Sequence, residues 1–512
     1  MKYNEFWKIL VVIISAAVTW PAIACADSAF PQGIASGEVR STSAVLWTRT
    51  TQQTSLTVTV SKDPQFKRGK IQKSVLASEA NDFTAKAVIT DLSPEQTYFY
   101  RWSDGAALSD IGSFRTAPPP ERKLDVRFAY SGDADGTKVN GQPVYNNFES
   151  LDAARGDDPD FFVYLGDTIY ADSVLKQHPD VTLDEFRQSY KVNLDYTALR
   201  NLLKSVSTYA IWDDHEIRDN WAGQTVDPTL FANGRKAFLE YMPIDAVELT
   251  INCSGRVPLF RVFHWGADVD VIILDERTCR DPDVQSKCLL PLGIPDPAPT
   301  LPSILRIAFG FPPSPPPGCL NAIFRPGRTM LGSLQKAAFK NALQSKAKFK
   351  FVITEIPMQQ FYALPYDRWE GYGSERNELL NFIRDQKIQN VIFLATDAHA
   401  NFINEVFIDR FQDPQRIADE FVTGPIATTT MQQDVLQHLG PGGLVALNAI
   451  LTIAGVDCRQ LDAYSYGLVD VNASAGTTTV TLKDDKGNVL HDQLNPSRTC
   501  TKTIGSRTLA SR

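Results

Sequence analysis

The segment FFVYLGDTIYAD, Phe161 to Asp172, decides the fold because it joins a strand pattern to two reactive side chains. Five apolar or aromatic residues, Phe161 to Leu165, run directly into glycine and Asp167, and Tyr170 follows three positions later. A continuous run of this kind is typical of a strand buried on both faces of a parallel sheet. The segment therefore predicts an α/β fold in which a buried strand delivers a carboxylate and a phenol to one edge of its sheet.

Three other strand-like runs also end in acidic residues. They are VRFAYSGDAD, which ends at Asp133 and Asp135; YAIWDDHE, which ends at Asp213, Asp214 and His215; and VIFLATDAHANF, which reaches Asp397 and then His399. In an open α/β sheet, residues just beyond the carboxyl ends of the strands line a common crevice. We therefore expect four distant segments to meet in one acidic pocket.

Each of these motifs, taken alone, has a structural explanation. An Asp after a strand is a favoured helix N-cap, and a single Tyr is more often a core residue whose hydroxyl finds a partner. Two observations favour a functional site: His215 and His399 each lie within two positions of such an Asp, and the chain contains only six histidines.

A cluster of carboxylates is costly because neighbouring like charges resist joint ionisation, and a multivalent cation removes that cost. Oxygen donors with one or two imidazoles suit Ca, Mg, Mn, Fe or Zn. Two metal ions would share a bridging carboxylate, and Asp167 fits that role. A phenolate ligand at Tyr170 needs a strong Lewis acid, which favours ferric iron.

The remaining composition restricts the class of protein. A chain of 512 residues suggests two domains, and a net charge of -8 with a pI near 5.4 argues against a general nucleic-acid binder. Residues 1–26 have the charged start, apolar stretch and small residues of a Sec-type signal peptide. The alternatives are a retained anchor, a buried first helix, or a lipoprotein at Cys25, which lacks the usual leucine of that motif.

Removal of the signal peptide would leave six cysteines, an even number that suggests disulfides in an exported protein. Sequence alone does not choose among their pairings. The cysteines are Cys253, Cys279, Cys288, Cys319, Cys458 and Cys500. We expect no transmembrane helix in the mature protein, which we expect to be periplasmic or extracellular and a monomer.

The sequence pattern changes at a proline-rich linker, TAPPPER. Residues 27–118 alternate as short strands and predict an immunoglobulin-like or fibronectin-like β-sandwich. Residues 122–495 alternate buried strands with amphipathic helices and predict the α/β domain, within which residues 281–325 form a proline-rich insertion stapled by Cys288 and Cys319. Residues 496–512 are expected to be a C-terminal tail.

Several motifs of the chain resemble those of a known family. The motifs GDTIYAD, WDDHEIRDNWAG, LDERTCR, DRWEGYGSERNELLNFI and DAHANF stand in the order found in the PhoD-type alkaline phosphatase/phosphodiesterase family of the metallophosphatase group. GIASGEVRSTSAVLWTRT to SFRTAP resembles its N-terminal domain. The likeness implies a layered α/β metallophosphatase sandwich behind an all-β domain.

The resemblance also implies roles for individual residues. Asp167 would bridge the metals and Tyr170 would bind iron, while the ligand set would be completed by Asp133, Asp214, His215, Asp397 and His399. Asn220 would help to arrange that edge of the site, and Asp135 is either a further calcium ligand or a turn residue. Arg277 matches a family arginine that could grip a phosphate, with a surface salt bridge as its alternative.

One departure from the family concerns the metal. Characterised members place a cysteine after the first strand, where this chain has Gly132 and Asp133. The family implies iron with calcium, and an all-oxygen-and-nitrogen pocket would also accept manganese, zinc or magnesium.

The predicted activity is metal-assisted hydrolysis of phosphate mono- or diesters, including phospholipase D-like diester cleavage. Asp167, His215 and Arg277 are the candidate catalytic residues, and His215 would protonate the leaving group or serve as a ligand. The alternatives are a secreted metal-dependent nuclease or nucleotidase, and a non-catalytic surface binding protein whose metal site is structural. We expect no sequence-specific recognition of nucleic acid.

Overall fold

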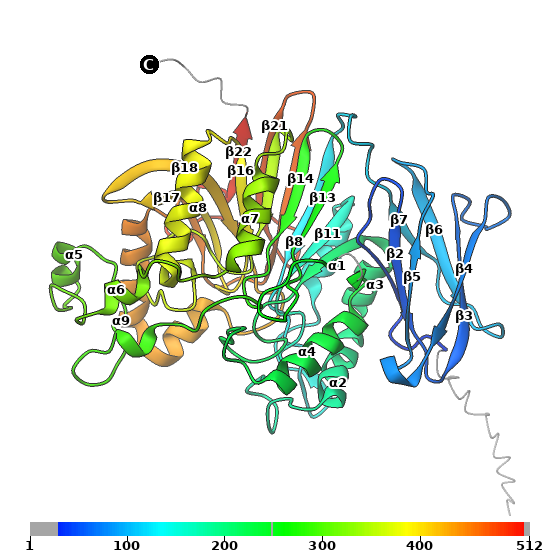
Figure 1. Ribbon diagram of the computed structural model, residues 1–512, viewed down its shortest axis with the longest axis horizontal. Coiled ribbons are helices and arrows are strands. Elements are labelled where there is room, and N and C mark those ends of the chain that lie inside the picture. The colour runs from blue at the N-terminus through cyan, green and yellow to red at the C-terminus, as the bar shows by residue number, and fades with distance from the viewer. Residues whose placement is uncertain (1–28, 247–248, 506–512) are drawn as a thin grey trace, which may run out of the picture.

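The computed structural model describes residues 29–246 and 249–505 (Figure 1). The predicted signal peptide, residues 1–26, lies outside the described residues. The strands of the N-terminal part are β1 (Ile34–Gly37), β2 (Ala44–Arg49), β3 (Thr54–Ser61), β4 (Ile71–Ala77), β5 (Thr84–Ile89), β6 (Thr97–Ser103) and β7 (Gly112–Arg115). These short strands agree with the alternation seen in the sequence.

The larger part alternates strands with helices. Its strands are β8 (Val126–Ser131), β9 (Lys138–Val139), β10 (Gln142–Pro143), β11 (Phe161–Leu165), β12 (Ser207–Ile211), β13 (Arg261–Trp265), β14 (Val269–Ile273), β15 (Phe349–Ile353), β16 (Val391–Ala395), β17 (Asn401–Asp409), β18 (Asp413–Val422), β19 (Cys458–Gln460), β20 (Ser465–Asn472), β21 (Thr477–Asp484) and β22 (Thr501–Gly505). Its helices are α1 (Glu149–Gly156), α2 (Leu183–Leu194), α3 (Thr197–Ser205), α4 (Pro228–Tyr241), α5 (Ser303–Ala308), α6 (Cys319–Ile323), α7 (Gly332–Leu343), α8 (Gly373–Asp385) and α9 (Met431–Ala454).

Two large sheets pack face to face in this part of the molecule. One has the strand order β22-β21-β20-β8-β11-β12-β1-β2-β5 and the other β13-β14-β15-β16-β18-β17-β19. Aromatic side chains fill the space between them. The rings of Phe128 and Phe351 pack edge to face with centroids 5.0 Å apart, and the ring centroids of Phe161 and Trp265 are 4.6 Å apart. Helices α7 and α8 cover the outer face of the second sheet, and their apolar residues share one core with β15 and β16. The predicted layered α/β sandwich is confirmed.

The N-terminal sandwich lies at the right of Figure 1 and is joined to the larger part through a continuous sheet. Strand β1 pairs in parallel with β12, where Gly37 lies opposite Thr208. A Cβ on Gly37 would lie 2.7 Å from the Thr208 carbonyl oxygen, so this approach requires glycine. The Trp47 indole also donates to the Glu240 carbonyl at 2.7 Å. No sequence pattern indicated that one sheet would contain strands from both sides of the proline-rich linker.

The end of the described chain extends the same sheet. Strand β20 pairs antiparallel with β8, and β22, which lies within residues 496–512, pairs with β21. A disulfide between Cys458 and Cys500 links this edge to β19. The stretch predicted as a tail thus contributes a strand to the sheet.

All six cysteines noted above form disulfides: Cys253–Cys279, Cys288–Cys319 and Cys458–Cys500. The Cys288–Cys319 bond confirms the predicted staple of the insertion. A buried ion pair between Arg306 and Asp296, 2.7 Å apart, further fixes this insertion around α5.

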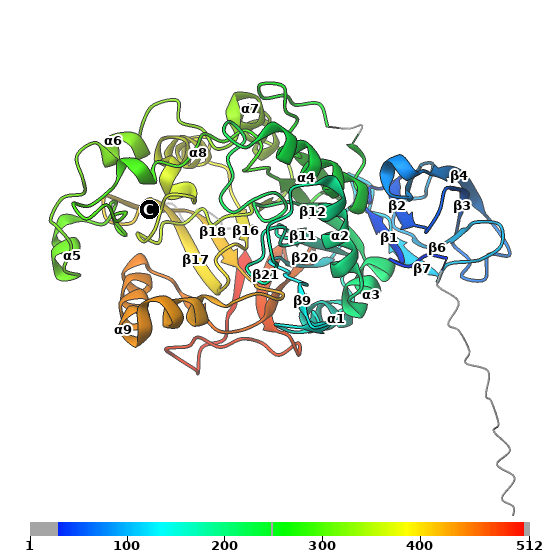
Figure 2. The same ribbon diagram turned by 90° about the horizontal axis from the view of Figure 1, so that it is seen from below.

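Helix α9 is the one helix among the described residues whose length and hydropathy match those of a membrane span. Figure 2 shows it beside α5 at one end of the molecule. Its backbone leaves the helical conformation at Gly440, and Pro441 follows. The longer segment after this break would span only about 21 Å, less than the ~30 Å hydrocarbon core of a bilayer.

We predict that the Glu38→Gln variant is destabilised by about 3 kcal/mol, because it leaves the buried Arg261 without a charged partner. Both side chains are only 3% exposed, and this ion pair connects the N-terminal part to β13. Urea unfolding measures the loss. The matched control is Glu95→Gln, since the Arg122–Glu95 pair is 3.0 Å apart but has 55% and 23% exposed side chains; it should cost less than about 1 kcal/mol. Equal losses in the two variants would contradict the prediction.

Candidate metal centre

Strand β11 lies in the middle of its sheet and positions the site. It pairs in parallel with β8 on one side and β12 on the other, and all five of its residues are fully buried. Because the three strands run in the same direction, their carboxyl ends lie at one edge. The sequence expectation for Phe161 to Leu165 is confirmed in its bounds and in its burial.

Backbone contacts hold these strand ends close together. The Ala134 amide donates to the Asp167 carbonyl at 2.9 Å, and the Thr396 hydroxyl, just after β16, donates to the Leu165 carbonyl at 2.7 Å. A Cβ on Gly132 would lie 2.3 Å from that same Leu165 oxygen. The glycine at position 132 is therefore required by the closeness of β8 to β11, while Asp133 supplies the side chain.

Several site residues have left-handed backbones. The φ angles are 62° at Asp133, 49° at Asp167, 63° at Asp397 and 48° at His399. Residues other than glycine adopt this conformation uncommonly, with Asp, Asn and His enriched, and such strained residues cluster at functional sites. The sharp turns direct these side chains back across the sheet edge.

Two groups of side chains are arranged so that each could hold a metal ion. One consists of Asp133, Asp167 and His399, and the other of Asp167, Asp214 and His215. Within each group the candidate ligand atoms all lie within 4.8 Å of one another. Asp167 belongs to both groups, which is the position a bridging carboxylate would occupy.

Tyr170 lies between the two groups. Its hydroxyl is 3.0 Å from His399 Nε2, and its ring stacks on the His215 ring with centroids 4.1 Å apart. Burial and the charge of Asp167 raise the pKa of Tyr170 well above its ordinary value. Without a cation this phenol stays protonated.

The charges of the site are unbalanced. Burial raises the pKa of Asp133 well above its ordinary value, and the neighbouring Asp213 adds to the shift. The pKa of Asp167 is raised in the same way, by burial and by Asp214, although His215 opposes this. Asp133 Oδ2 is buried and has no hydrogen-bond partner among the residues that the structure describes. Orphaned, desolvated carboxylate oxygens beside imidazoles form a donor set that fits a hard or borderline metal cation.

The other predicted ligands lie at the rim of these groups. Asp397 belongs to neither; its amide donates to Asp133 Oδ1 at 3.3 Å, and burial, with the charge of Asp367, raises its pKa to about 8. The backbone amide of Asn220 donates to Asp214 Oδ2 at 2.6 Å, a contact that does not depend on the asparagine side chain. Asp135 accepts from the Ser173 hydroxyl at 2.6 Å and from the Thr137 amide at 2.9 Å, an arrangement typical of a turn.

Arg277 is fully buried, so the alternative of a surface salt bridge does not describe it. Its Nε donates to Asp213 Oδ1 at 2.5 Å, and its Nη1 lies 2.9 Å from Asp367 Oδ2. Its Nη2 is 3.6 Å from Asp214 Oδ2 and makes no hydrogen bond within residues 29–246 and 249–505. The guanidinium thus compensates several of the buried acids of the site.

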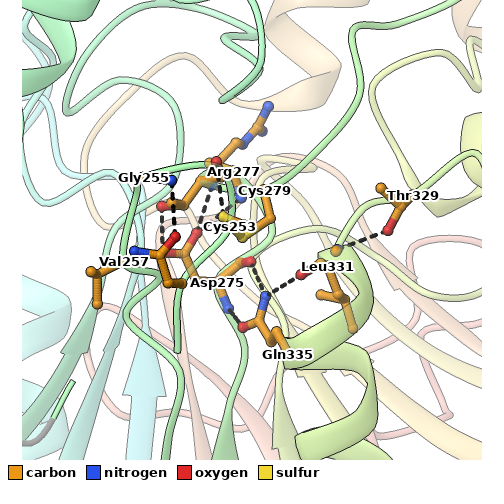
Figure 3. Close-up of a disulfide and its surroundings, with 12 residues drawn as sticks. Cys253, Gly255, Val257, Asp275, Arg277, Cys279, Thr329, Leu331 and Gln335 are labelled. Carbon is orange, nitrogen blue, oxygen red and sulfur yellow. Dashed lines mark hydrogen bonds between the residues drawn. A yellow bond between two sulfur atoms is a disulfide. The ribbon is translucent and has the colours of Figure 1, made fainter. Parts of the chain in front are cut away.

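The loop that carries Arg277 is held from both sides, as Figure 3 shows. The Asp275 carboxylate accepts from the Arg277 amide at 3.1 Å, and the Gln335 side chain on α7 pairs with the Asp275 backbone at 2.8 and 2.9 Å. The Cys253–Cys279 disulfide follows directly. Helix α7 and the disulfide together fix the position of the arginine.

Sequence reasoning did not assign roles to three of the acids that surround the site. Asp213 and Asp367 pair with Arg277, and Asp172 contacts His215. Asp213 was visible as a strand-end acid. The pairing of Asp367 depends on a contact across 90 residues that no local pattern signals.

The fold and the acidic sheet edge define a hydrolase of the metallophosphatase class. A family model for the PhoD-like phosphatase matches residues 135–482, and one for the PhoD-like phosphatase N-terminal domain matches residues 16–118. The chain belongs to the PhoD-like phosphatase family. By class it is a phosphoric ester hydrolase.

Individual relatives agree with this assignment. Alkaline phosphatase D of Bacillus subtilis (strain 168) is 24% identical over 425 residues, a match that spans 74% of this chain and 66% of the relative. The solved structure of PhoD has a TM-score of 0.71 at 19% identity and covers 94% of this chain and 93% of its own. The purple acid phosphatase PPD1 from yellow lupin (Lupinus luteus) seeds has a TM-score of 0.55 at 11% identity, covers 94% of this chain and 78% of its own, and shows the same fold.

We predict that Gly132→Ala loses metal binding and about 1 to 3 kcal/mol of stability, because the added methyl group forces β8 and β11 apart at the site. Elemental analysis and urea unfolding measure the two effects. Gly156→Ala, at the end of α1, is the control and should change neither, because the new methyl group would meet no described atom within 4 Å apart from its chain neighbours and the backbone of its own helix. A metal-loaded Gly132→Ala protein would show that the close approach is dispensable.

The pKa of Asp397 is raised to about 8, which predicts that ionisation of this residue lowers the stability of the metal-free protein as the pH rises. For an acid with a raised folded pKa, the unfolded state binds fewer protons, so its contribution to stability falls as pH rises from about 4 to about 8. Asp397→Asn should therefore melt at the same temperature as the chelator-treated wild type at pH 4 and at a higher temperature at pH 8.5. Added metal should close the gap; a gap that narrows with pH in the absence of metal would contradict the assignment.

Proposed function

We propose that the chain is an exported, metal-dependent phosphoesterase that hydrolyses phosphodiesters and also accepts monoesters. The observation that carries the proposal is the position of Asp167, which is shared by two groups of candidate ligands at one sheet edge. Paired metals bridged by a carboxylate are a recurrent solution for phosphoryl transfer, since they clamp both the attacking and the leaving oxygen.

We propose iron and calcium as the metals, with manganese, zinc or magnesium as alternatives. Tyr170 beside His399 favours a ferric ion in the first group, and the second group, which also has two carboxylates and one imidazole but lacks the phenol contact to its histidine nitrogen, is left for calcium. When bound, such ions would lower the pKa of a water molecule and neutralise charge on the phosphoryl group. The oxygen of Asp133 would supply a ligand where family members carry cysteine.

The chain's own residues would orient this chemistry. Asp214 is held by the Asn220 amide, and the His215 amide donates to Asp167 Oδ1 at 3.2 Å, so the ligand carboxylates are fixed before substrate arrives. His215, whose side chain is 21% exposed, would either complete the second ligand group or, in place of that role, donate a proton to the leaving oxygen. Arg277 is fully buried and its Nη2 lies 3.6 Å from Asp214 Oδ2, so its proposed part is to neutralise the acids of the site; a direct grip on a phosphoryl oxygen would require the guanidinium to become exposed.

Export is supported by the three disulfides, since such bonds persist in oxidising compartments. The signal peptide at residues 1–26, the periplasmic or extracellular location and the monomeric state remain part of the proposal.

The competing functions differ in substrate and in turnover. A nuclease or nucleotidase would use the same metals, but a net charge of -8 disfavours binding of a polyanion. A binding protein with a structural metal site would not turn over any ester. Hydrolysis of bis-p-nitrophenyl phosphate without cleavage of DNA would argue against a nuclease. Turnover that a chelator abolishes would argue against a binding protein with a structural metal site.

We predict that Asp167→Asn abolishes turnover, by at least about a thousandfold, and removes bound metal, because the amide cannot bridge two cations. Phosphodiester and phosphomonoester assays run beside elemental analysis of the exported protein provide the measurement. Asp157→Asn is the control, since Asp157 pairs with Lys483 and Tyr466 outside the candidate ligand groups. Full activity of the Asp167 variant would refute the shared-ligand role.

A further inference from the structure

A basic cavity lies at the end of the second sheet that is opposite the metal edge. It is formed by the loop between α7 and β15 and the loop between α8 and β16, and its volume is about 470 Å³. Strands β15 and β16 run parallel, and Asp397 follows the carboxyl end of β16. Because the cavity adjoins the amino ends of these strands, it is roughly 15 to 20 Å from the metal edge along the strands.

Four lysines line this cavity, and none of the described residues around it is acidic. Lys346 and Lys348 come from the first loop, Lys387 from the second, and Lys350 from β15. None of these four ammonium groups forms an ion pair within the described part of the chain. In a protein with a net charge of -8, this is a local concentration of uncompensated positive charge.

A larger neighbouring cavity of about 700 Å³ shares the second loop with the basic cavity. Its other cations already have carboxylate partners. Arg416 and Lys502 both pair with Asp419, the lysine at 3.0 Å, and Arg384 lies 2.9 Å from Asp413. The unpaired positive charge is therefore confined to the smaller cavity.

Lys350 brings one of the four charges into a buried position. The residue is 5% exposed, and its Nζ donates to the Ala347 carbonyl. Asp270, which lies opposite Lys350 in the strand register, is bound to His264 instead. Burial lowers the pKa of Lys350, although the charge of Asp270 opposes this shift. Since a buried ammonium group without an ion-pair partner is costly, a bound anion would compensate it.

The loops that form the cavity also follow the C-terminal ends of α7 and α8, where lysines favour the partial negative charge of a helix. Two helix ends amount to about one negative charge in total, against the four ammonium groups of the lining. The helices therefore do not account for all of the positive charge. A neutral donor is also present, since Ser345 Oγ lines the cavity, is buried and has no hydrogen-bond partner among the described residues.

We propose that this basic cavity is a binding site for a compact anion that carries two or more phosphate groups, such as a short polyphosphate. Ammonium groups bind phosphate oxygens through charge-assisted hydrogen bonds. A compact ligand fits because the unpaired charge is confined to one cavity. A membrane surface fits less well, since none of the exposed large apolar side chains of the described residues lines this cavity. The site is separate from the metal edge and does not depend on the proposed function.

The first test is calorimetric titration of tripolyphosphate, at low salt, into the full-length Asp167→Asn protein, whose disabled metal edge should not compete for phosphate. We expect one ligand per chain. Lys346 and Lys387 are exposed, so their replacement should not disturb the core. Adding Lys346→Gln and Lys387→Gln together should weaken binding at least about tenfold, because two charge-assisted contacts are lost. Absence of tripolyphosphate binding before the lysines are changed would overturn the proposal.

The matched control is the pair Lys336→Gln and Lys340→Gln, which changes the net charge by the same amount. Both lysines lie on α7 outside the cavity and pair with Glu378. This double variant should change the affinity less than about twofold, because its charges are solvated and screened. Equal weakening by the two double variants would show a general charge effect and would contradict a specific site.

Lys350→Met tests the buried charge. Methionine keeps an unbranched apolar side chain and removes the ammonium group. We expect this variant to lose tripolyphosphate binding and to unfold at the same or a higher urea concentration than its parent, because the cost of burying the charge is removed. Unchanged affinity would refute the role of Lys350. If the variant did not fold, the comparison of the two exposed double variants would still decide the proposal.

Two further probes identify the ligand class. Orthophosphate should bind at least about tenfold more weakly than tripolyphosphate, since it reaches fewer of the lysines; equal affinities would refute a ligand with several phosphate groups. Sedimentation with phosphatidylglycerol vesicles that depends on Lys346 and Lys387, without binding of tripolyphosphate, would assign this face to a membrane and overturn the proposal. None of these measurements uses turnover, so an enzyme inactive on every ester would refute the proposed function alone.

Discussion

The burial of Asp167 at the carboxyl end of β11 is the constraint on which the rest of this structure depends. A carboxylate that is 2% exposed loses its hydration, and Asp214 and Asp213 near it increase the cost of its charge. The fold provides this position because a strand buried on both faces ends where two neighbouring strands also end. The other features of the site either compensate the negative charge of Asp167 or fix the position of its carboxylate.

Part of the compensation is built into the protein. The guanidinium of Arg277 pairs with Asp213 and Asp367, and the imidazole of His215 pairs with Asp172. Asp133 and Asp167 have no such partner among the described cations, and these are the two carboxylates grouped with His399. The chain therefore separates its acids into those held by its own cations and those left for an external one.

The sequence was informative wherever the signal was local. The run Phe161 to Leu165 and the acids after four strands could be predicted, because burial and periodicity act over a few residues. The paired role of Arg277 could not, since its partners are 64 and 90 residues distant. The joining of β1 to β12 was missed for the same reason: a short pairing at Gly37 leaves no periodic trace.

That pairing changes how the two domains must be regarded. Because one sheet runs from β5 of the N-terminal part through β12 to β22, the sandwich cannot swing as a hinged lid without breaking main-chain hydrogen bonds. The sandwich and the larger part therefore form one rigid body. The pairing of Gly37 with Thr208 therefore fixes the sandwich relative to the strand that precedes Asp213 and Asp214.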